Sequence, residues 1–365
     1  MTKKAKKDIT ILNIGDRVDY DSFQKLDKEK RFASKAGFYY RSCSYDDLLE
    51  GRLPRILTEK VVVFFFFPFN YWDSRIEHRR YKGVYGNKNF FRQFHHFCEM
   101  TTDALRAGLP DKKVMLVDDP MLSVLGRDKA RVMDKLIRKG VTVPHQFRAR
   151  RVRDIRALLK EGYSIYIKPK CGSMGKGITF LSLGEWQTNF YFRNGRIVSR
   201  KSDKGWKFRD MTGDNAFLGE LLKKNIYIEE GIDSLNIKGD KVDLRIYTFI
   251  DKALYIYPRR NKLGAVTTNI SQGGKGDPEL LDVIPRKVLD KAGRMAVRAA
   301  RALGLYLAGI DVVMDSSLKK AYVVDVNMYP GFPKRKTFNL SRAMLSELKR
   351  LERSGKLRFR PLISK

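Results

Sequence analysis

The sequence predicts an α/β protein (α+β in part) with a small parallel sheet near its N-terminus. Apolar runs at residues 9–14, 61–67 and 113–117 have the length of strands, and residues 90–107 have the spacing of an amphipathic helix. Strands that alternate with helices favour a parallel sheet. Residues 61–67 are almost wholly apolar, which is typical of a strand buried on both faces.

The chain after residue 125 is predicted to hold further strands and helices. We expect a helix from Asp128 to Gly140, because aspartate is a good N-cap and glycine commonly ends a helix. Residues 141–148 have the pattern of a strand interrupted by Pro144, and Asn194 and Gly195 indicate a hairpin turn. Further strands are expected at residues 164–168, 178–181, 226–230, 244–250, 253–257, 308–314 and 321–326, and helices at residues 286–303 and from residue 341 to Gly355.

Composition limits the classes of protein to consider. The chain has 365 residues, of which 43% are apolar, a globular composition long enough for two or three domains. Three cysteines without Cys-x-x-Cys spacing predict neither a disulfide framework nor a thiolate zinc site. The N-terminal apolar stretch is too short for a secretory signal, and no apolar run approaches the roughly 20 residues of a membrane span. We therefore expect a cytoplasmic protein.

The net charge of +33 is the most unusual bulk property. A positive field of this size raises the local concentration of anions. Nucleic acid, an acidic peptide or polymer, a phosphorylated small molecule and an anionic membrane surface are all compatible with it, and so is a role in solubility alone. Charge by itself does not choose among these partners.

A glycine-rich segment lies between two predicted strands. Gly172, Gly175 and Gly177 lack a Cβ, so backbone N–H groups there can approach phosphate oxygens, and Lys168 and Lys176 add positive charge. No Lys-Ser or Lys-Thr follows, and a strand rather than a helix comes next, which excludes a Walker loop. The segment reads either as a flap over a nucleotide or as a plain hairpin turn.

Acidic residues on two later strands are candidate metal ligands. Asp311 lies on the strand at 308–314, and Asp325 and Asn327 follow on or just after the strand at 321–326. Residues two apart on a strand face the same way, so Asp325 and Asn327 can act together. Oxygen ligands of this kind, completed by phosphate oxygens, suit Mg²⁺. The alternative is that the aspartates only cap turns.

Two polar segments are candidates for binding an anion. Arg245 shares a strand face with Asp243, so it either orients a phosphate or forms a structural ion pair. The loop at residues 267–274, which contains Asn269 and ends in two glycines, is preceded by Arg259 and Arg260. It offers hydroxyl, amide and cationic donors, although a solvent loop has the same composition. The chain's four histidines include no His-x-x-x-His pair, which argues against a histidine metal site.

Taken in order, these segments resemble the ATP-grasp superfamily, and within it the ribosomal-protein glutamate ligases and the endospore-coat-associated (YheC/YheD-type) proteins. The resemblance covers residues 115–335. It implies an ATP-grasp fold that binds ATP and Mg²⁺. It assigns nucleotide binding to Lys129, Lys168, Gly172, Ser173, Gly175, Gly177, Glu229, Glu230 and Asp243, metal binding to Asp311, Asp325 and Asn327, and catalysis to Lys176, Arg245, Arg260 and Asn269.

The same resemblance implies a division of the chain into four segments. Residues 1–125 are expected to form an N-terminal α/β domain, and residues 126–230 a subdomain with the phosphate flap. Residues 231–340 are expected to hold the metal and acceptor site, and residues 341–365 a basic helix and tail.

The chain departs from the resembling families at two positions. Asp325 stands where the family usually has glutamate, and Thr267 stands where the glutamate ligases have an arginine that holds the substrate carboxylate or acyl phosphate. Arg259 or Arg260 is expected to compensate for that missing arginine.

The resemblance implies a carboxylate–amine ligase that forms an amide or peptide bond through an acyl phosphate. The expected acceptor is anionic: an acidic peptide, an amino acid or a phosphorylated small molecule. One alternative is a kinase acting on a polyol or inositol phosphate, because residues 325–332 also resemble the inositol polyphosphate kinases of this superfamily. A second alternative is a non-catalytic protein that binds anions or nucleic acid. The resembling families also imply a possible homo-oligomer.

Overall fold

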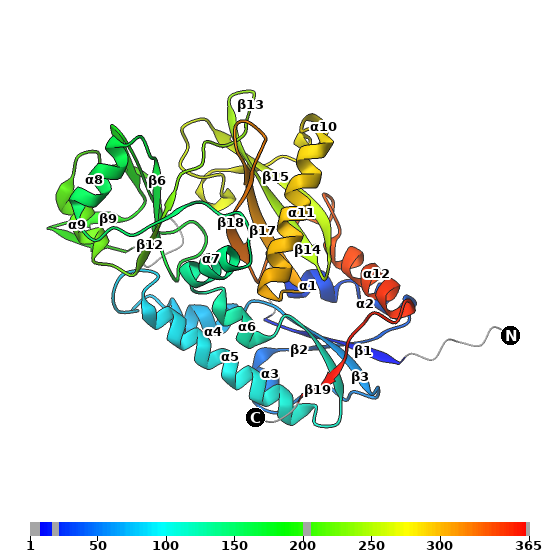
Figure 1. The fold of residues 1–365 in the computed structure, drawn as a ribbon. Helices are drawn as coiled ribbons and strands as arrows, with labels where there is room; N and C mark the ends of the chain where they lie inside the picture. Colours follow the sequence, from blue (N-terminus) through cyan, green and yellow to red (C-terminus); the bar gives the residue numbers. More distant parts are fainter. Residues whose placement is uncertain (1–7, 17–21, 200–205, 363–365) are drawn as a thin grey trace.

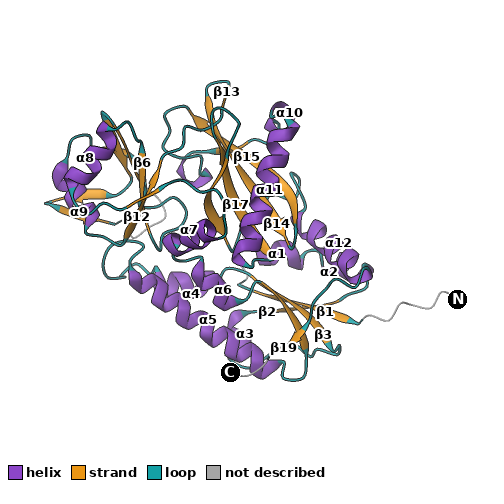
Figure 2. Ribbon diagram, viewed as in Figure 1, coloured by secondary structure: helices purple, strands orange, loops and turns teal. Residues whose placement is uncertain are grey.

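The computed structural model describes residues 8–16, 22–199 and 206–362, which form four sheets (Figures 1 and 2). The first sheet belongs to the N-terminal region. The second and third lie in the middle of the chain, and the fourth lies toward the C-terminus. The predicted α/β architecture with an N-terminal parallel sheet is confirmed.

The first sheet has the strand order β19-β4-β3-β1-β2. Its strands are β1 (Ile9–Ile14), β2 (Tyr39–Cys43), β3 (Lys60–Phe65), β4 (Lys113–Val117) and β19 (Arg360–Pro361). The first four pair in parallel, and β19 is antiparallel to β4. The predicted strands β1, β3 and β4 are confirmed, whereas β2 was not predicted, because its largely polar sequence gives no apolar run.

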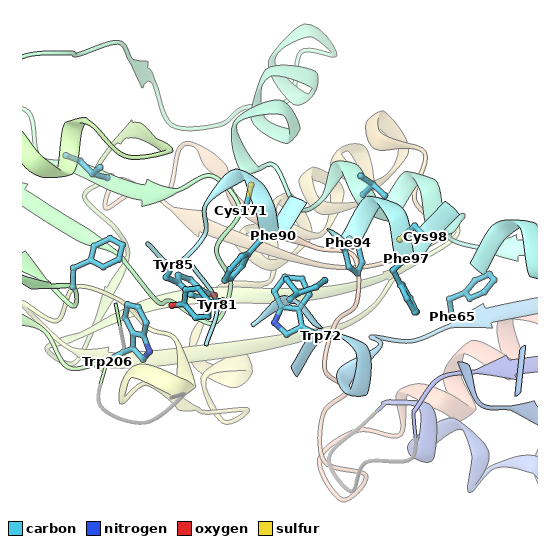
Figure 3. Close-up of a cluster of buried hydrophobic side chains, with 14 of the residues drawn as sticks. Phe65, Trp72, Tyr81, Tyr85, Phe90, Phe94, Phe97, Cys98, Cys171 and Trp206 are labelled. Atoms are coloured by element: carbon cyan, nitrogen blue, oxygen red, sulfur yellow. The ribbon is translucent and has the colours of Figure 1, made fainter. Parts of the chain in front are cut away.

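Short helices and one long helix surround this sheet. They are α1 (Ser22–Asp27), α2 (Lys30–Lys35), α3 (Tyr45–Leu49), α4 (Phe69–Tyr71), the π-helix η1 (Trp72–Ile76), α5 (Lys88–Gly108) and α6 (Pro120–Leu125). Helix α5 begins at the N-cap Asn87 and buries Phe90, Phe94 and Phe97. Figure 3 shows these rings beside Trp72 in one aromatic cluster. The cluster anchors the segment that precedes α5, which carries part of the site.

The middle region begins with α7 (Lys129–Arg138) and forms a six-stranded sheet in the order β11-β8-β7-β6-β12-β5. Its elements are β5 (Gln146–Phe147), α8 (Val152–Lys160), β6 (Ile165–Pro169), β7 (Thr179–Ser182), β8 (Glu185–Thr188), β11 (Arg209–Asp210), α9 (Asn215–Leu222) and β12 (Ile226–Glu230). The hairpin of β9 (Tyr191–Arg193) and β10 (Arg196–Val198) turns at Asn194 and Gly195, with φ of 48° and 69°. This is the predicted turn.

The strand predicted at residues 141–148 is wrong over most of its length, because only β5 is a strand. The Val141 N–H donates to the carbonyl of Leu136 at 3.0 Å, so this residue closes helix α7 instead of joining a ladder. Pro144 has no N–H to donate. Pairing with β12 begins only after the proline, at Gln146.

The C-terminal sheet is antiparallel, in the order β16-β15-β14-β17-β18, with β13 on β14. Its strands are β13 (Asn236–Ile237), β14 (Asp240–Phe249), β15 (Lys252–Lys262), β16 (Lys275–Gly276), β17 (Leu307–Met314) and β18 (Ala321–Asn327). The 3-10 helix η2 (Ile270–Gln272) and the helix α10 (Leu280–Val283) precede α11 (Arg286–Leu303), which packs on this sheet with buried alanines and ends at Gly304, φ 81°. Helix α11 has the predicted bounds.

The last segment returns to the N-terminal region. Helix α12 (Leu340–Arg353) packs with α1, and its Arg342 Nε lies 2.6 Å from Oε2 of the buried Glu29. Strand β19 then joins the first sheet. The four-segment division of the chain stays a prediction, but its last segment is packed against its first.

None of the helices in the described part of the chain has both the length and the apolar character that crossing a bilayer requires.

Candidate functional site

A cavity of about 840 Å³ lies where the N-terminal region, the middle sheet and the C-terminal sheet meet. Most of the predicted site residues line it. They are Lys129, Lys168, Gly172, Ser173, Gly175, Lys176, Glu229, Glu230, Asp243, Arg245, Asn269, Asp311, Asp325 and Asn327. Residues up to 196 positions apart in the sequence are thus in contact here.

The acidic pair lies on neighbouring strands. Antiparallel pairing of β17 with β18 sets Asp311 directly opposite Asp325, and Asn327 opposite Gly309. The Nδ2 of Asn327 donates to the Gly309 carbonyl at 3.2 Å, which leaves its amide oxygen as the atom available to a ligand. Two carboxylates and one amide oxygen therefore lie on adjacent strands beside the cavity.

Two arginines, the half-buried Arg245 and the buried Arg259, neutralise Asp311. Arg245 lies opposite Asp311 in the β14–β17 pairing and forms a two-point ion pair with it. Arg259 Nη2 lies 3.1 Å from Asp311 Oδ2 and 2.5 Å from Asp243 Oδ2. Burial raises the pKa of Asp311, but the charges of Arg245 and Arg259 outweigh burial and lower that pKa to about 2. Asp311 is therefore ionised at neutral pH.

Two lysines pair with acids across the cavity. Lys129, the first residue of α7, pairs with Asp325, and Lys168 on β6 pairs with Glu229 on β12. Burial alone lowers the pKa of Lys168, but the Glu229 charge more than offsets this and raises it. Lys168 is therefore cationic at neutral pH. Each lysine pairs with one acid, which an incoming anionic ligand can replace.

The glycine segment folds over the cavity as a strained loop. Met174, Gly175 and Gly177 have φ of 56°, 69° and 74°, a region that favours glycine. A Cβ on Gly177 would lie 2.6 Å from Phe190 and from Pro169. Gly177 does not line the cavity; it lets the loop turn.

Contacts from both sides hold this loop. The Ser173 N–H donates to the Tyr85 hydroxyl at 3.0 Å, and Lys176 Nζ lies 2.5 Å from Glu77 Oε1. From the other side, the Ser271 hydroxyl donates to the Met174 carbonyl at 2.8 Å. The loop that contains Asn269 therefore contacts the flap directly.

Arg260 is the predicted catalytic residue that the structure sets apart from the cavity. Its guanidinium pairs with Asp240 and lies 2.6 Å from Asp277 Oδ2. The pairing of β14 with β15 sets Arg259 opposite Asp243, which directs the preceding residue, not Arg260, to the cavity side. Arg259 is thus the arginine that accompanies Arg245.

Comparison with models of known protein families identifies the family of this chain. Residues 118–351 match the model of the YheC/D-like ATP-grasp family. The match includes every cavity residue from Lys129 to Asn327 and spans more than half of the chain. The protein belongs to the YheC/D-like ATP-grasp family.

Curated relatives of this ATP-grasp protein include probable alpha-L-glutamate ligases. Probable alpha-L-glutamate ligase 1 of Shewanella sp. (strain W3-18-1) is 28% identical over 220 residues, and the probable alpha-L-glutamate ligase of Thioalkalivibrio sulfidiphilus (strain HL-EbGR7) is 27% identical over 220 residues. In both cases the match covers 60% of this chain and 60% of the relative. The ATP-grasp chain thus spans 60% of the length of the curated relatives it matches.

Solved structures show the same fold over nearly the whole chain. The ATP-grasp ligase PsnB, complexed with minimal precursor, Mg and ADP, has a TM-score of 0.53 at 15% identity, and the match covers 93% of this chain and 97% of PsnB. The RiPP-associated ATP-grasp ligase of Chryseobacterium gregarium, in complex with ADP and a leader and core peptide, has a TM-score of 0.54 at 12% identity, covering 93% and 96%. The ATP-grasp fold is therefore confirmed for this chain.

The residues present fit a nucleotide with Mg²⁺. In the described part of the chain no three acidic, histidine or cysteine side chains converge on one point. Asp311 and Asp325 therefore need the Asn327 oxygen and phosphate oxygens to complete an octahedral set, as Mg²⁺ bound with a nucleotide commonly does. Glu229 Oε2 is buried and has no hydrogen-bond partner among the described residues. Such an acceptor suits a donor group of a bound nucleotide.

Sequence reasoning missed three contributors to the site. Glu77 and Tyr85 reach the flap from the N-terminal region, and Arg127 lines the cavity two residues before Lys129. Arg127 lies two positions before the predicted nucleotide lysine Lys129, and this proximity was the one available signal. Nothing in the sequence around Glu77 or Tyr85 marks them as flap contacts, because their partners lie about a hundred positions away.

Proposed function

We propose that the chain is an ATP- and Mg²⁺-dependent carboxylate–amine ligase that acts on an anionic acceptor. One observation carries the proposal: Asp311 and Asp325 lie opposite each other beside Arg245 and Lys129, in the cavity that the glycine flap covers. Paired acids that hold a metal, with cations around them, suit transfer of a phosphoryl group. The names of the curated relatives and of the ATP-grasp ligases with the same fold support the ligase class.

Each residue has a role that its placement supports. Asp311, Asp325 and Asn327 would hold Mg²⁺, which supplies charge neutralisation at the β- and γ-phosphates when it is bound. Lys129 and Lys168 would exchange their acidic partners for phosphate oxygens. The flap amides, with Lys176 and Asn269 beside them, would cover the phosphates, and Glu229 and Glu230 would contact the adenosine. Asp243 would fix Arg259.

The reaction then follows from positioning and charge. An oxygen of the acceptor carboxylate attacks the γ-phosphorus, the bond to the bridging oxygen breaks, and ADP leaves with the negative charge. Arg245 and Arg259 face the resulting acyl phosphate as charge-assisted donors. The amine nitrogen attacks the acyl carbon, the carbon–oxygen bond to phosphate breaks, and the amine releases a proton. No protein nucleophile is required.

A trapping screen tests this function. Amino acids, acidic peptides and phosphorylated polyols are incubated with ATP, Mg²⁺ and hydroxylamine, and the products are identified by mass spectrometry. We expect ADP release together with a hydroxamate of one carboxylate, because hydroxylamine captures an acyl phosphate. A phosphate ester of a hydroxyl group would instead identify a kinase. Anion binding without any ATP turnover would identify the non-catalytic alternative.

A further inference from the structure

Arg127 occupies an unusual position in the wall of the cavity. Its guanidinium carbon lies 4.8 Å from the ring centre of Trp72, 5.1 Å from Phe67 and 5.2 Å from Phe94. Figure 3 shows Trp72 and Phe94 side by side in the aromatic cluster that supports this wall. An aromatic ring packs against the face of a planar guanidinium. The N–H groups, which lie in the plane of the guanidinium, stay available to bind an anion.

The charge of Arg127 is not neutralised by the described part of the protein. Arg245 and Arg259 each pair with a buried aspartate. Among residues 8–16, 22–199 and 206–362, by contrast, the Arg127 guanidinium contacts aromatic rings and forms no ion pair with a carboxylate. Burial lowers its pKa, as expected for a cation removed from water without a counter-charge. A half-buried guanidinium without a counter-charge beside a cavity is suited to binding an anion.

The wall around Arg127 is built largely of aromatic side chains. It runs from the end of β3 to the end of β18, and Phe67 contacts Phe69 and Tyr329 at centroid distances of 4.8 and 5.9 Å. The aromatic residues that line this side of the cavity are Phe66, Phe67, Phe69, Trp72, Tyr329 and Phe332. The nucleotide side, with Lys129, Lys168 and the two aspartates, is by contrast polar. A ligand that fills the aromatic side buries an apolar body.

We infer that Arg127 and this aromatic wall form the subsite for the acceptor, and that the acceptor is a carboxylate with an aromatic or other bulky apolar body. The inference rests on the proposed ligase function and gives its acceptor a chemical class. A carboxylate matches the fork of the guanidinium and its single charge, and the rings pack against the body. Arg127 is thus a binding residue that selects the acceptor.

Four matched ligands separate the contribution of the carboxylate charge to binding from the contribution of the apolar body. Binding of phenylacetate, phenylacetamide, acetate and phenyl phosphate is measured by calorimetry, with and without Mg–ADP. We expect phenylacetate to bind at least about 10-fold more tightly than either phenylacetamide or acetate, because it alone uses both the guanidinium and the rings. Arg127→Met should remove the preference of the protein for phenylacetate over phenylacetamide. Arg127→Lys should keep part of that preference.

Arg131→Met is the matched control. Arg131 lies four residues further on, in the first turn of α7, with its guanidinium 5.5 Å from the ring centre of Phe91, but its side chain is 65% exposed and does not line the cavity. This variant should bind all four probes as the wild type does. Unchanged binding of Mg–ADP by the Arg127 variants shows that they are folded.

Two results would overturn the inference. One is equal binding of phenylacetate by the wild type and Arg127→Met. The other is tighter binding of phenyl phosphate than of phenylacetate, which would assign the subsite to a phosphorylated acceptor. Because the measurement needs no turnover, a carboxylate preference at Arg127 without any hydroxamate in the trapping screen would contradict the proposed ligase function and leave the subsite standing.

Discussion

At the scale of single residues, Asp325 is the side chain on which the proposed metal site depends most. It is a shorter acid than the resembling families usually have, and Lys129 pairs with it. Burial raises its pKa, but the charge of Lys129 more than offsets burial and lowers it. Asp325 is therefore ionised and able to exchange Lys129 for a divalent cation.

Replacing this acid tests the assignment. Asp325→Asn keeps the size of the side chain and removes its charge, so we expect ATP turnover to fall at least about 100-fold and to need more Mg²⁺. Asp240→Asn makes the same chemical change on β14, where the acid pairs with Arg260 outside the cavity. Turnover measured against Mg²⁺ concentration should separate the two variants. Equal activity of Asp325→Asn and Asp240→Asn would remove Asp325 from the site.

A second buried aspartate makes stability depend on pH. Asp118, with φ 65°, accepts hydrogen bonds from the backbone N–H groups of Tyr306 and Leu307. Burial raises its pKa to about 7, against the lowering effect of these bonds. The folded state therefore holds a proton that the unfolded chain releases near pH 4, so this stabilisation is complete below that pH and is lost as pH rises through 7.

Asp118→Asn keeps an acceptor oxygen and tolerates the positive φ, but it does not titrate. Between pH 5 and pH 7 we expect the wild type to lose roughly 1–3 kcal/mol of unfolding free energy relative to the variant. Denaturant titrations of both proteins at several pH values measure this difference. Parallel stability profiles would show that Asp118 does not titrate in this range.

Neighbouring residues show what the sequence cannot specify at this scale. Lys129, Lys168, Asp311 and Asp325 were predicted from motifs, and all four line the cavity. Arg259 and Arg260 are adjacent, and consecutive side chains on a strand point to opposite faces. Only the pairing of β15 with β14 decides that Arg259 faces the cavity. The register of β15 on β14 cannot be predicted from the sequence alone.

At the scale of elements, the flap is held by the N-terminal region. The Lys176–Glu77 ion pair is almost fully buried, with side chains 2% and 14% exposed. Removing one partner of a buried pair leaves the other charge without compensation and is strongly unfavourable. We therefore expect this ion pair to keep the flap closed over the cavity.

Glu77→Gln tests this contact. The substitution removes the carboxylate that lies 2.5 Å from Lys176 Nζ and holds the flap to the N-terminal region, so the backbone amides of residues 171–177 should exchange hydrogen at least about 10-fold faster. The matched control is Glu220→Gln, which removes the acid of an exposed Glu–Lys pair on α9. Unchanged exchange in the flap of Glu77→Gln would show that other contacts keep it closed.

Element prediction succeeded where the pattern was local. Helix α11 has an unbroken amphipathic pattern and a terminal glycine, and its predicted bounds are those observed. The strand prediction for residues 141–148 failed because a hydrogen bond that closes α7 and a proline, rather than strand pairing, determine the backbone conformation there. Strands β14 and β15 extend beyond the predicted bounds because cross-strand ion pairs such as Asp243–Arg259 keep charged residues in the ladder.

At the scale of the whole molecule, the cavity depends on long-range packing that no local pattern predicts. Helix α12 and β19 return to the N-terminal region. The aromatic cluster of Figure 3 joins that region to the flap through Tyr85, whose hydroxyl accepts a hydrogen bond from the Ser173 N–H at 3.0 Å. The aromatic wall thus combines residues 66–72 with Tyr329 and Phe332, which follow the strand that carries Asp325. The cavity that this wall shares with the metal acids is what allows a carboxylate acceptor to meet a nucleotide.

Oxygen transfer tests the central claim most directly. Both oxygens of the acceptor carboxylate are labelled with ¹⁸O, and turnover is carried out with ATP, Mg²⁺ and the amine. The released phosphate is then analysed by mass spectrometry. An acyl phosphate requires that one labelled oxygen leave with phosphate, because the carboxylate oxygen that attacks the γ-phosphorus is the one the amine displaces. We predict one ¹⁸O in the phosphate for each amide formed. Unlabelled phosphate accompanying the product would contradict the account.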